Sequence, residues 1–272
     1  MVTPLSKIIA AYTKVMISVD RSPQPNHSMS MGLLLTAFLL IPVLGWAEVF
    51  FSDSNATGFF VSESGHLVTA YHAVENRKVS VVLADGRAVP AEVIRYNKEA
   101  DLALLKIPYK TAYLSIAQPD NIQIGMEIMT IGYPMISVQG SSAKVARGII
   151  NTLVGFHGDG SSFQFDAATA RGNSGGPVIG AEGLVVGVVN GKLHTTKVLE
   201  RTKEWVVNVN YATNAATLIT FLGGVNGLAN IRPLPADAVF NVRKLYAETH
   251  QAVVPVVSDM SDRASSSQRA SD

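Results

Sequence analysis

The segment Gly172-Asn173-Ser174-Gly175-Gly176-Pro177 surrounds one serine with glycines. A nucleophilic serine needs a tight turn that exposes its hydroxyl and points backbone N–H groups at one place, and glycine permits both. In an acyl-transfer site, the N–H groups of Gly172 and Ser174 would bind the oxyanion of a tetrahedral intermediate. Taken alone, the segment also fits a glycine-rich hairpin turn with an incidental serine. Ser174 is therefore a candidate nucleophile that requires a partner base.

A serine hydroxyl is a weak nucleophile, so it needs a histidine that a carboxylate orients. Of the six histidines, His72 stands where the apolar run 67–70 enters a polar turn. Asp101 stands at the mouth of the apolar run 102–107. Each has an ordinary structural explanation by itself, as a core histidine and as a turn aspartate. Neither residue alone therefore identifies the catalytic base.

The elements that must position these residues are mostly strands. From Thr57 to about Leu222, β-branched runs alternate with turn residues roughly every ten positions, which is typical of a β-sandwich or β-barrel. Asp85-Gly86 between the runs 79–84 and 88–96 predicts a tight hairpin, because both residues tolerate positive φ. The run 215–222, followed by Gly223-Gly224, predicts a short closing helix. Further strands are expected at 58–61, 66–69, 102–107, 127–131, 162–165, 184–190 and 205–211.

The three segments together resemble the trypsin-like serine peptidases, and among them the bacterial HtrA/Deg type, in which the chain order is His, Asp, Ser. The spacings, 101 − 72 = 29 and 174 − 101 = 73, agree with that family's arrangement. The agreement includes Thr-Ala-x-His, Asp-Leu-Ala-Leu-Leu-Lys-Ile, Ile-Gly-Tyr-Pro and Phe-Asp-Ala-Ala, and it extends from about Gly58 to Leu222. The resemblance implies an all-β fold of two six-stranded antiparallel β-barrels, chymotrypsin-like, with a short C-terminal helix. The peptidase domain would cover 48–222, with barrel 1 at about 50–117 and barrel 2 at about 123–222.

The resemblance also implies a role for each residue. Ser174 would attack the peptide carbonyl, His72 would transfer the proton, and Asp101 would orient His72. The N–H groups of Gly172 and Ser174 would form the oxyanion hole. The base of the substrate pocket would be Ala168, with a wall from Val189, Asn190 and Gly191. Because Ala168 is small and neutral, we expect apolar P1 side chains to be preferred.

This sequence departs from the family pattern near the serine. Asn173 precedes Ser174 where digestive members carry the aspartate of a zymogen switch, so no such switch is expected, as in the HtrA type. Arg171 stands where relatives often have proline. HtrA-type chains usually continue into a PDZ domain, whereas 272 − 222 = 50 residues follow the expected domain here. Allosteric control through a PDZ domain is therefore not expected.

Composition excludes several other functions. Lys plus Arg is 22 against 21 for Asp plus Glu, so no basic excess exists to bind nucleic acid. The absence of cysteine excludes disulfides, thiolate nucleophiles and thiolate metal sites. No His-x-x-x-His pair or acidic calcium loop is present, so no cofactor is expected. The expected partners are protein or peptide substrates, and the sequence leaves an oligomer open.

The N-terminal region indicates export. Residues 31–47 form an uncharged apolar run of seventeen residues that ends Gly45-Trp46-Ala47, which fits a signal peptide cleaved after Ala47. About thirty residues precede this run, so an uncleaved membrane anchor is the alternative for residues 1–47. With either, the domain that follows would be periplasmic or secreted.

The C-terminal residues 223–272 are expected to be a tail, with a helix within 236–251 and disorder from 258 to 272.

The whole pattern predicts a serine endopeptidase that acts on proteins outside the cytoplasm. The competing interpretation is a peptidase-fold binding or chaperone-like module whose catalysis is latent or lost.

Overall fold

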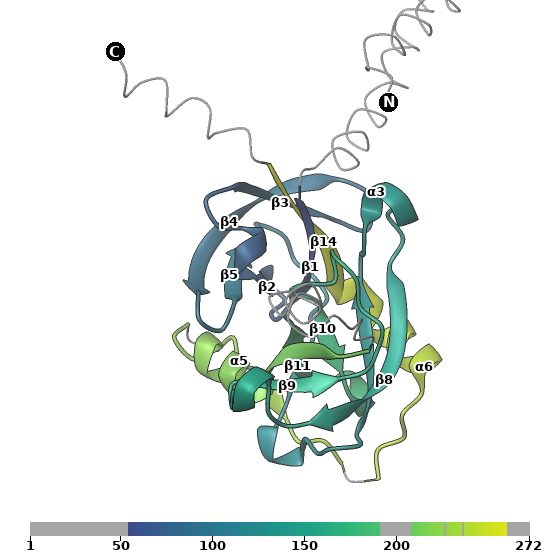
Figure 1. Ribbon diagram of the computed structural model, residues 1–272. Helices are drawn as coiled ribbons and strands as arrows, with labels where there is room; N and C mark the ends of the chain where they lie inside the picture. The colour runs from purple at the N-terminus through teal and green to yellow at the C-terminus, as the bar shows by residue number, and fades with distance from the viewer. Residues whose placement is uncertain (1–53, 191–207, 226, 236, 260–272) are drawn as a thin grey trace, which may run out of the picture. The chain divides into compact units, whose positions relative to one another are not determined.

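The computed structural model describes residues 54–190, 208–225, 227–235 and 237–259. The described residues form two β-barrels (Figure 1). Barrel 1 is closed in the order β1-β14-β3-β4-β5-β2. Its strands are β1 (Ser54–Phe60), β2 (His66–Ala70), β3 (Lys78–Val82), β4 (Ala88–Asn97), β5 (Leu102–Lys106) and β14 (Val253–Asp259).

Barrel 2 runs β10-β7-β8-β9-β12-β11 and is closed by pairing of β10 with β11. Two-residue strands β6 and β13 extend it in parallel beside β11. Its strands are β6 (Ile116–Ala117), β7 (Glu127–Gly132), β8 (Lys144–Thr152), β9 (Ser162–Phe165), β10 (Pro177–Ile179), β11 (Val185–Val189), β12 (Asn210–Asn214) and β13 (Ile231–Arg232). The expected fold of two six-stranded antiparallel barrels is confirmed.

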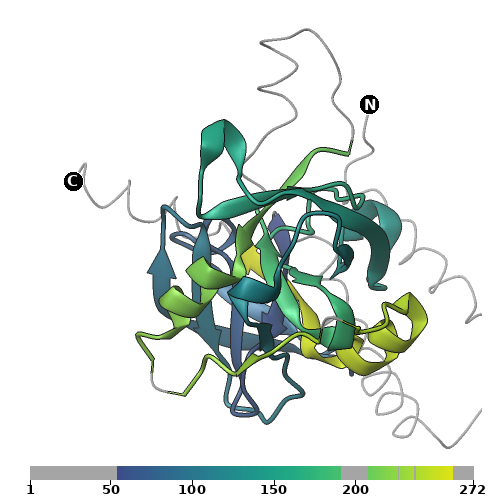
Figure 2. The ribbon, with the colours of Figure 1, turned by 90° about the horizontal axis from the view of Figure 1, so that it is seen from below.

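Helices are short in the described part of the chain. They are η1 (Tyr71–Ala73), η2 (Pro119–Asn121), α3 (Ile136–Gln139), η3 (Phe156–Gly158), η4 (Ala181–Gly183), α5 (Ala215–Leu222), α6 (Val242–Thr249) and η5 (His250–Ala252). Helix α5 has the predicted bounds and is capped by Asn214, whose side chain accepts the N–H of Thr217. Figures 1 and 2 show α5 and α6 on opposite sides of the described fold.

The strands follow the sequence pattern that predicted them. The hairpin of β3 and β4 pairs Val82 with Ala88 around Asp85-Gly86, and Gly86 has φ 83°. Strand β5 is buried along Leu102–Leu105, which explains its continuous apolar run. Each barrel therefore has its own apolar core.

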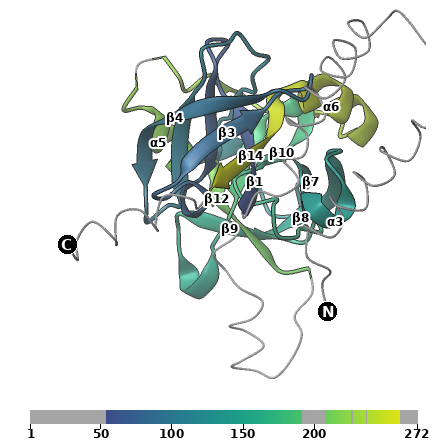
Figure 3. The ribbon, with the colours of Figure 1, turned by 90° about the horizontal axis from the view of Figure 1, so that it is seen from above.

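Barrel 1 is completed by the C-terminal segment. Strand β14 pairs with β1 from Ser54 to Phe59 and with β3 from Lys78 to Val81, and Figure 3 shows it between them. Val254 and Val256 enter the barrel core. Without β14, the facing edges of β1 and β3 would leave buried N–H and C=O groups unpaired.

This arrangement differs from the expected boundaries. Barrel 1 does not lie within residues 50–117, because residues 253–259 supply one of its strands. The expected tail from 223 contains β13, α6 and β14, and α6 lies within the predicted helix 236–251. Ser258, expected to begin a disordered tail, is a buried strand residue. Residues 260–272 lie outside the described residues.

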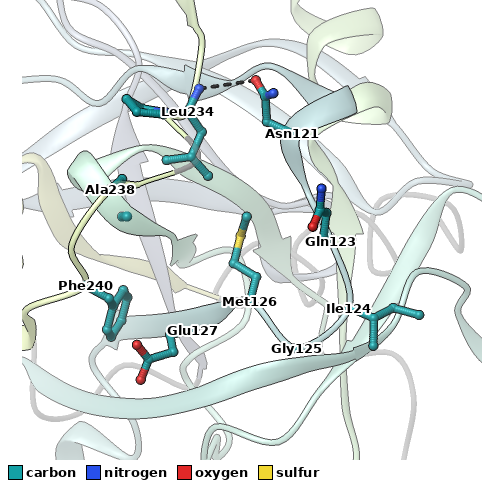
Figure 4. Close-up of a pocket in the computed structure, with 11 residues that line it drawn as sticks. Asn121, Gln123, Ile124, Gly125, Met126, Glu127, Leu234, Ala238 and Phe240 are labelled. Carbon is teal, nitrogen blue, oxygen red and sulfur yellow. Dashed lines mark hydrogen bonds between the residues drawn. The ribbon is translucent and has the colours of Figure 1, made fainter.

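The C-terminal segment also packs on barrel 2. The N–H of Leu234 donates to Asn121 Oδ1 at 3.2 Å, and Arg147 lies over the ring of Phe240. A cavity of about 400 Å³ lies between this segment and the start of β7, with Met126 facing Leu234 and Phe240 across it (Figure 4). The described residues of 228–235 and 237–259 therefore contact both barrels.

No helix among the described residues is both long and apolar enough to span a membrane. The apolar run 31–47, expected to be a signal peptide or anchor, lies outside the described residues.

Candidate active site

His72 and Asp101 meet because their strands pair. His72 lies in η1, directly after β2, and Asp101 directly precedes β5, with Ala70 opposite Leu102. The Asp101 carboxylate contacts His72 twice, with Oδ2 2.7 Å from Nδ1 and Oδ1 accepting the backbone N–H at 3.0 Å. Asp101 is 2% exposed, whereas the His72 side chain is 39% exposed. A buried carboxylate thus holds a histidine whose ring reaches solvent.

The backbone around this pair is constrained. Asp101 has φ 56°, a left-handed conformation that aspartate adopts more readily than most residues. Its carbonyl accepts the N–H of Tyr71 at 3.1 Å. The Tyr71 ring stacks on Tyr96, with centroids 4.8 Å apart. Its hydroxyl donates to Glu75 at 2.8 Å, and this bond is the main reason that the pKa of Tyr71 is raised to about 12. The turn that carries His72 is therefore tied to β4 and to Asp101.

The Ser174 turn contacts barrel 1 through glycine. Gly175 has φ 82°, and a Cβ there would lie 2.5 Å from the carbonyl oxygen of Thr57 and 2.5 Å from Thr69 Oγ1. Real side chains do not approach so closely, so only glycine allows this contact. Because Thr69 lies in β2, which leads into His72, the approach brings the Ser174 turn toward the His72 turn.

Hydrogen bonds fix the backbone of the same turn. The Ser174 carbonyl accepts the N–H of Thr57 at 2.9 Å, and the N–H of Gly175 donates to Val189 at 2.8 Å. Gly172 has φ 103°, and its carbonyl accepts from Thr57 Oγ1 at 2.7 Å. Within the described residues, the N–H groups of Gly172 and Ser174 have no protein acceptor.

The structure joins two of the three predicted catalytic residues directly. His72 and Asp101 are hydrogen-bonded, whereas the Ser174 hydroxyl, which is half-buried, makes no hydrogen bond to any described residue. Nucleophile–base hydrogen bonds are often long without substrate and tighten in the complex. Among residues 54–190 and the later described ranges, no group of three His, Asp or Glu side chains is placed to hold a metal ion.

The residues predicted for the pocket lie on two segments of barrel 2. Ala168 is exposed in the loop after β9, Val189 ends β11 and is buried, and Asn190 is half-buried. Gly191 lies outside the described residues.

The loop that carries Ala168 is held by Asn210, which sequence reasoning did not select. Its side chain donates to the Ala167 carbonyl at 2.9 Å and accepts from Thr169 Oγ1 at 2.5 Å. Asn210 is more than forty residues from this loop in the sequence, and no local motif marks it.

The known proteins that are similar to this chain include trypsin-like peptidases. Residues 56–188 match the family model of the trypsin-like peptidase domain. The chain is 35% identical over 191 residues to the uncharacterized protein y4bJ of Sinorhizobium fredii, covering 69% of this chain and 30% of that protein. It is 38% identical over 143 residues to a probable periplasmic serine endoprotease, DegP-like, of Chlamydia muridarum, covering 49% and 27%. The chain thus spans less than a third of the length of these relatives.

Solved structures show the same fold. A serine endoprotease from Yersinia pestis aligns with a TM-score of 0.52 at 22% identity, covering 65% of this chain and 58% of that one. The HtrA-type protease AlgW, solved with a decapeptide, aligns with a TM-score of 0.53 at 24% identity, covering 63% and 52%.

Proposed function

We propose that this chain, whose residues 56–188 match the trypsin-like peptidase domain and which is similar to DegP-like serine endoproteases, hydrolyses peptide bonds with Ser174, His72 and Asp101 as its catalytic residues. The observation that carries the proposal is the double contact of the buried Asp101 carboxylate with His72. An ionised carboxylate only accepts hydrogen bonds, so in a neutral imidazole held by it Nδ1 carries the proton and Nε2 offers a lone pair. That tautomer is the one that can take a proton from a serine hydroxyl.

The proposed reaction proceeds through an acyl-enzyme. Ser174 Oγ attacks the peptide carbonyl carbon while its proton passes to His72 Nε2, and the carbonyl oxygen becomes an oxyanion. The N–H groups of Gly172 and Ser174, which have no acceptor among the described residues, are the proposed donors to that oxyanion. His72 then gives the proton to the leaving amine. Water, activated by the same histidine, hydrolyses the acyl-enzyme and restores Ser174.

The proposed substrates are proteins or peptides outside the cytoplasm, with apolar P1 side chains above Ala168. The location is supported by relatives named as periplasmic endoproteases and by the apolar run 31–47. The pocket preference is supported by the size and neutrality of Ala168.

A fluorophosphonate probe tests the proposal, because it phosphonylates a serine only where a base and an oxyanion site activate the hydroxyl. The wild type should be labelled at Ser174, and Ser174→Ala should not be labelled. Ser161→Ala is the matched control, since that hydroxyl donates to Asp159 in the same barrel, and it should be labelled like the wild type. A folded wild type that resists the probe would instead favour the peptidase-fold binding module.

A further inference from the structure

Two buried threonines form hydrogen bonds between the barrels. One donates from barrel 1 to barrel 2, and the other donates from barrel 2 to barrel 1. Thr57 lies in β1 of barrel 1 and is 0% exposed, and Thr213 lies in β12 of barrel 2 and is 2% exposed. Each hydroxyl donates to a backbone carbonyl of the other barrel. The partners are more than a hundred residues apart in the sequence in both cases.

Thr57 holds the turn of the proposed nucleophile. Its Oγ1 donates to the Gly172 carbonyl at 2.7 Å, and its backbone N–H donates to the Ser174 carbonyl at 2.9 Å. The carbonyl between them, that of Asn173, accepts the N–H of Gly176 at 3.0 Å. The Thr57 hydroxyl also accepts the N–H of Tyr133 at 3.0 Å, so both its donor and an acceptor position are used. The peptide planes on either side of the Ser174 N–H are thereby fixed to barrel 1.

Thr213 forms a hydrogen bond to the turn that carries Asp101. Its Oγ1 donates at 2.9 Å to the carbonyl of Ala100, the residue directly before Asp101. Asp101 has φ 56°, a conformation that persists only where its surroundings hold it. The N–H of Ala100 is also held, by Asn97 Oδ1 at 3.0 Å. The peptide that leads into Asp101 is thus fixed from barrel 2.

The two hydrogen bonds bear on how the proposed catalytic residues are placed relative to one another. His72 and Asp101 belong to barrel 1 and Ser174 to barrel 2, so their relative placement depends on how the barrels dock. A misplacement of about 1 Å between reacting groups can cost about 100-fold in rate. Each threonine hydroxyl connects the turn of one barrel to a strand of the other, directly beside a catalytic residue.

We propose that Thr57 and Thr213 are positioning residues of the peptidase reaction, which hold the Ser174 turn and the Asp101 turn in register through reciprocal hydrogen bonds between the barrels. The proposal rests on the catalytic assignment above. It assigns neither threonine a contact with substrate.

The test replaces each hydroxyl by a methyl group at nearly constant volume. Thr57→Val and Thr213→Val should each lower kcat for a peptide substrate by about 10- to 100-fold, with KM changed by less than about threefold. The rate of fluorophosphonate labelling should fall in parallel. Thr57→Ser and Thr213→Ser keep the hydroxyl and should remain within about threefold of the wild type.

Thr249→Val is the control for a merely structural role. Thr249 is 3% exposed, and its hydroxyl donates to the Leu245 carbonyl within α6 at 2.6 Å. It should lose thermal stability like the other two variants but keep wild-type kcat. Equal loss of kcat in all three valine variants would overturn the proposal, as would unchanged kcat in Thr57→Val and Thr213→Val.

If a valine variant does not fold, the proposal is tested instead by comparing the Thr→Ser and Thr→Cys variants at the same position. Both changes remove the γ-methyl group, but a thiol is a weak donor, so the cysteine variant alone should lose kcat. Failure of this inference can be told apart from failure of the proposed function. A wild type that the probe does not label refutes the catalytic assignment, whereas a labelled wild type with unaffected threonine variants refutes this inference alone.

Discussion

The Asp101 carboxylate holds its histidine at two points, the ring Nδ1 and the backbone N–H. Asp101→Asn keeps the size of the side chain but presents an NH₂ group to one of these donors, which favours the wrong ring tautomer. We expect kcat to fall by about 10⁴-fold with the fold retained. Peptide hydrolysis and a thermal unfolding curve measure both quantities. Asp85→Asn, at an exposed aspartate paired with Arg87, should leave kcat unchanged. A loss below tenfold in Asp101→Asn would contradict this role.

Gly175 is the residue on which the approach of the Ser174 turn to barrel 1 depends. Gly175→Ala imposes an unfavourable φ of 82° and also places a Cβ 2.5 Å from the Thr57 carbonyl oxygen. We expect a loss of more than about 2 kcal/mol in the free energy of unfolding, measured in urea. Gly158→Ala has nearly the same φ, 81°, but no atom within 4 Å of the new Cβ, so it should cost only about 1 kcal/mol. Equal losses in the two variants would mean that the close approach has no energetic importance.

At the scale of elements, β14 is the strand whose removal is most informative. A chain that ends at residue 252 leaves the edges of β1 and β3 unpaired and empties the places of Val254 and Val256. We expect loss of cooperative unfolding and of activity, together with aggregation through the open edges. The control chain ends at residue 259, which keeps every described residue, and should unfold like the full chain. Wild-type stability in the shorter chain would show that barrel 1 does not need this strand.

Tyr133, which directly follows β7, contacts β14, since its hydroxyl donates to the Val253 carbonyl at 3.1 Å. Burial raises the pKa of Tyr133 to about 12, above the ordinary value of about 10. The native state therefore holds this proton more tightly than the unfolded state. The stability that results is complete below pH 10 and is lost as the pH rises from about 10 to 12, by about 1 to 3 kcal/mol. Urea unfolding across this range should show a steeper decline for the wild type than for Tyr133→Phe. Parallel declines would contradict the buried hydroxyl.

Sequence patterns predicted the elements whose signals are local. Asp85-Gly86 predicted the β3–β4 hairpin, and the run that ends at Gly223-Gly224 predicted α5. Strand β14 was not predicted, because Val-Val-Pro-Val-Val contains a proline and its partner β1 is about two hundred residues away. The structure accommodates Pro255 where pairing with β3 has ended, so that no N–H is needed there.

The residues of the candidate site also divide into those that a local sequence signal marks and those that no such signal marks. The glycines around Ser174 and the strand ends at His72 and Asp101 are local signals, and joint occurrence made them specific. The hydrogen bonds of Thr57, Thr213 and Asn210 depend on contacts between distant segments, which no local pattern encodes.

At the scale of the whole molecule, the proposed chemistry is divided between the barrels. Barrel 1 supplies the histidine and the carboxylate already joined, and barrel 2 supplies the serine turn, which docks on β1 and β2 through Gly175. The C-terminal segment contacts both barrels and closes the first. We therefore expect the proposed active site to work only as a unit.

The measurement that tests this account most directly is kcat for Ser174→Ala, His72→Ala and the double variant on one peptide substrate. Residues that act as a unit are non-additive, so each single change should lower kcat by about four to six orders of magnitude, and the double variant should be little worse. Thermal unfolding of each variant confirms that the fold is intact. If His72→Ala instead kept more than about a tenth of wild-type kcat, another residue would be the base, and the assignment of Ser174, His72 and Asp101 as one catalytic unit would be wrong.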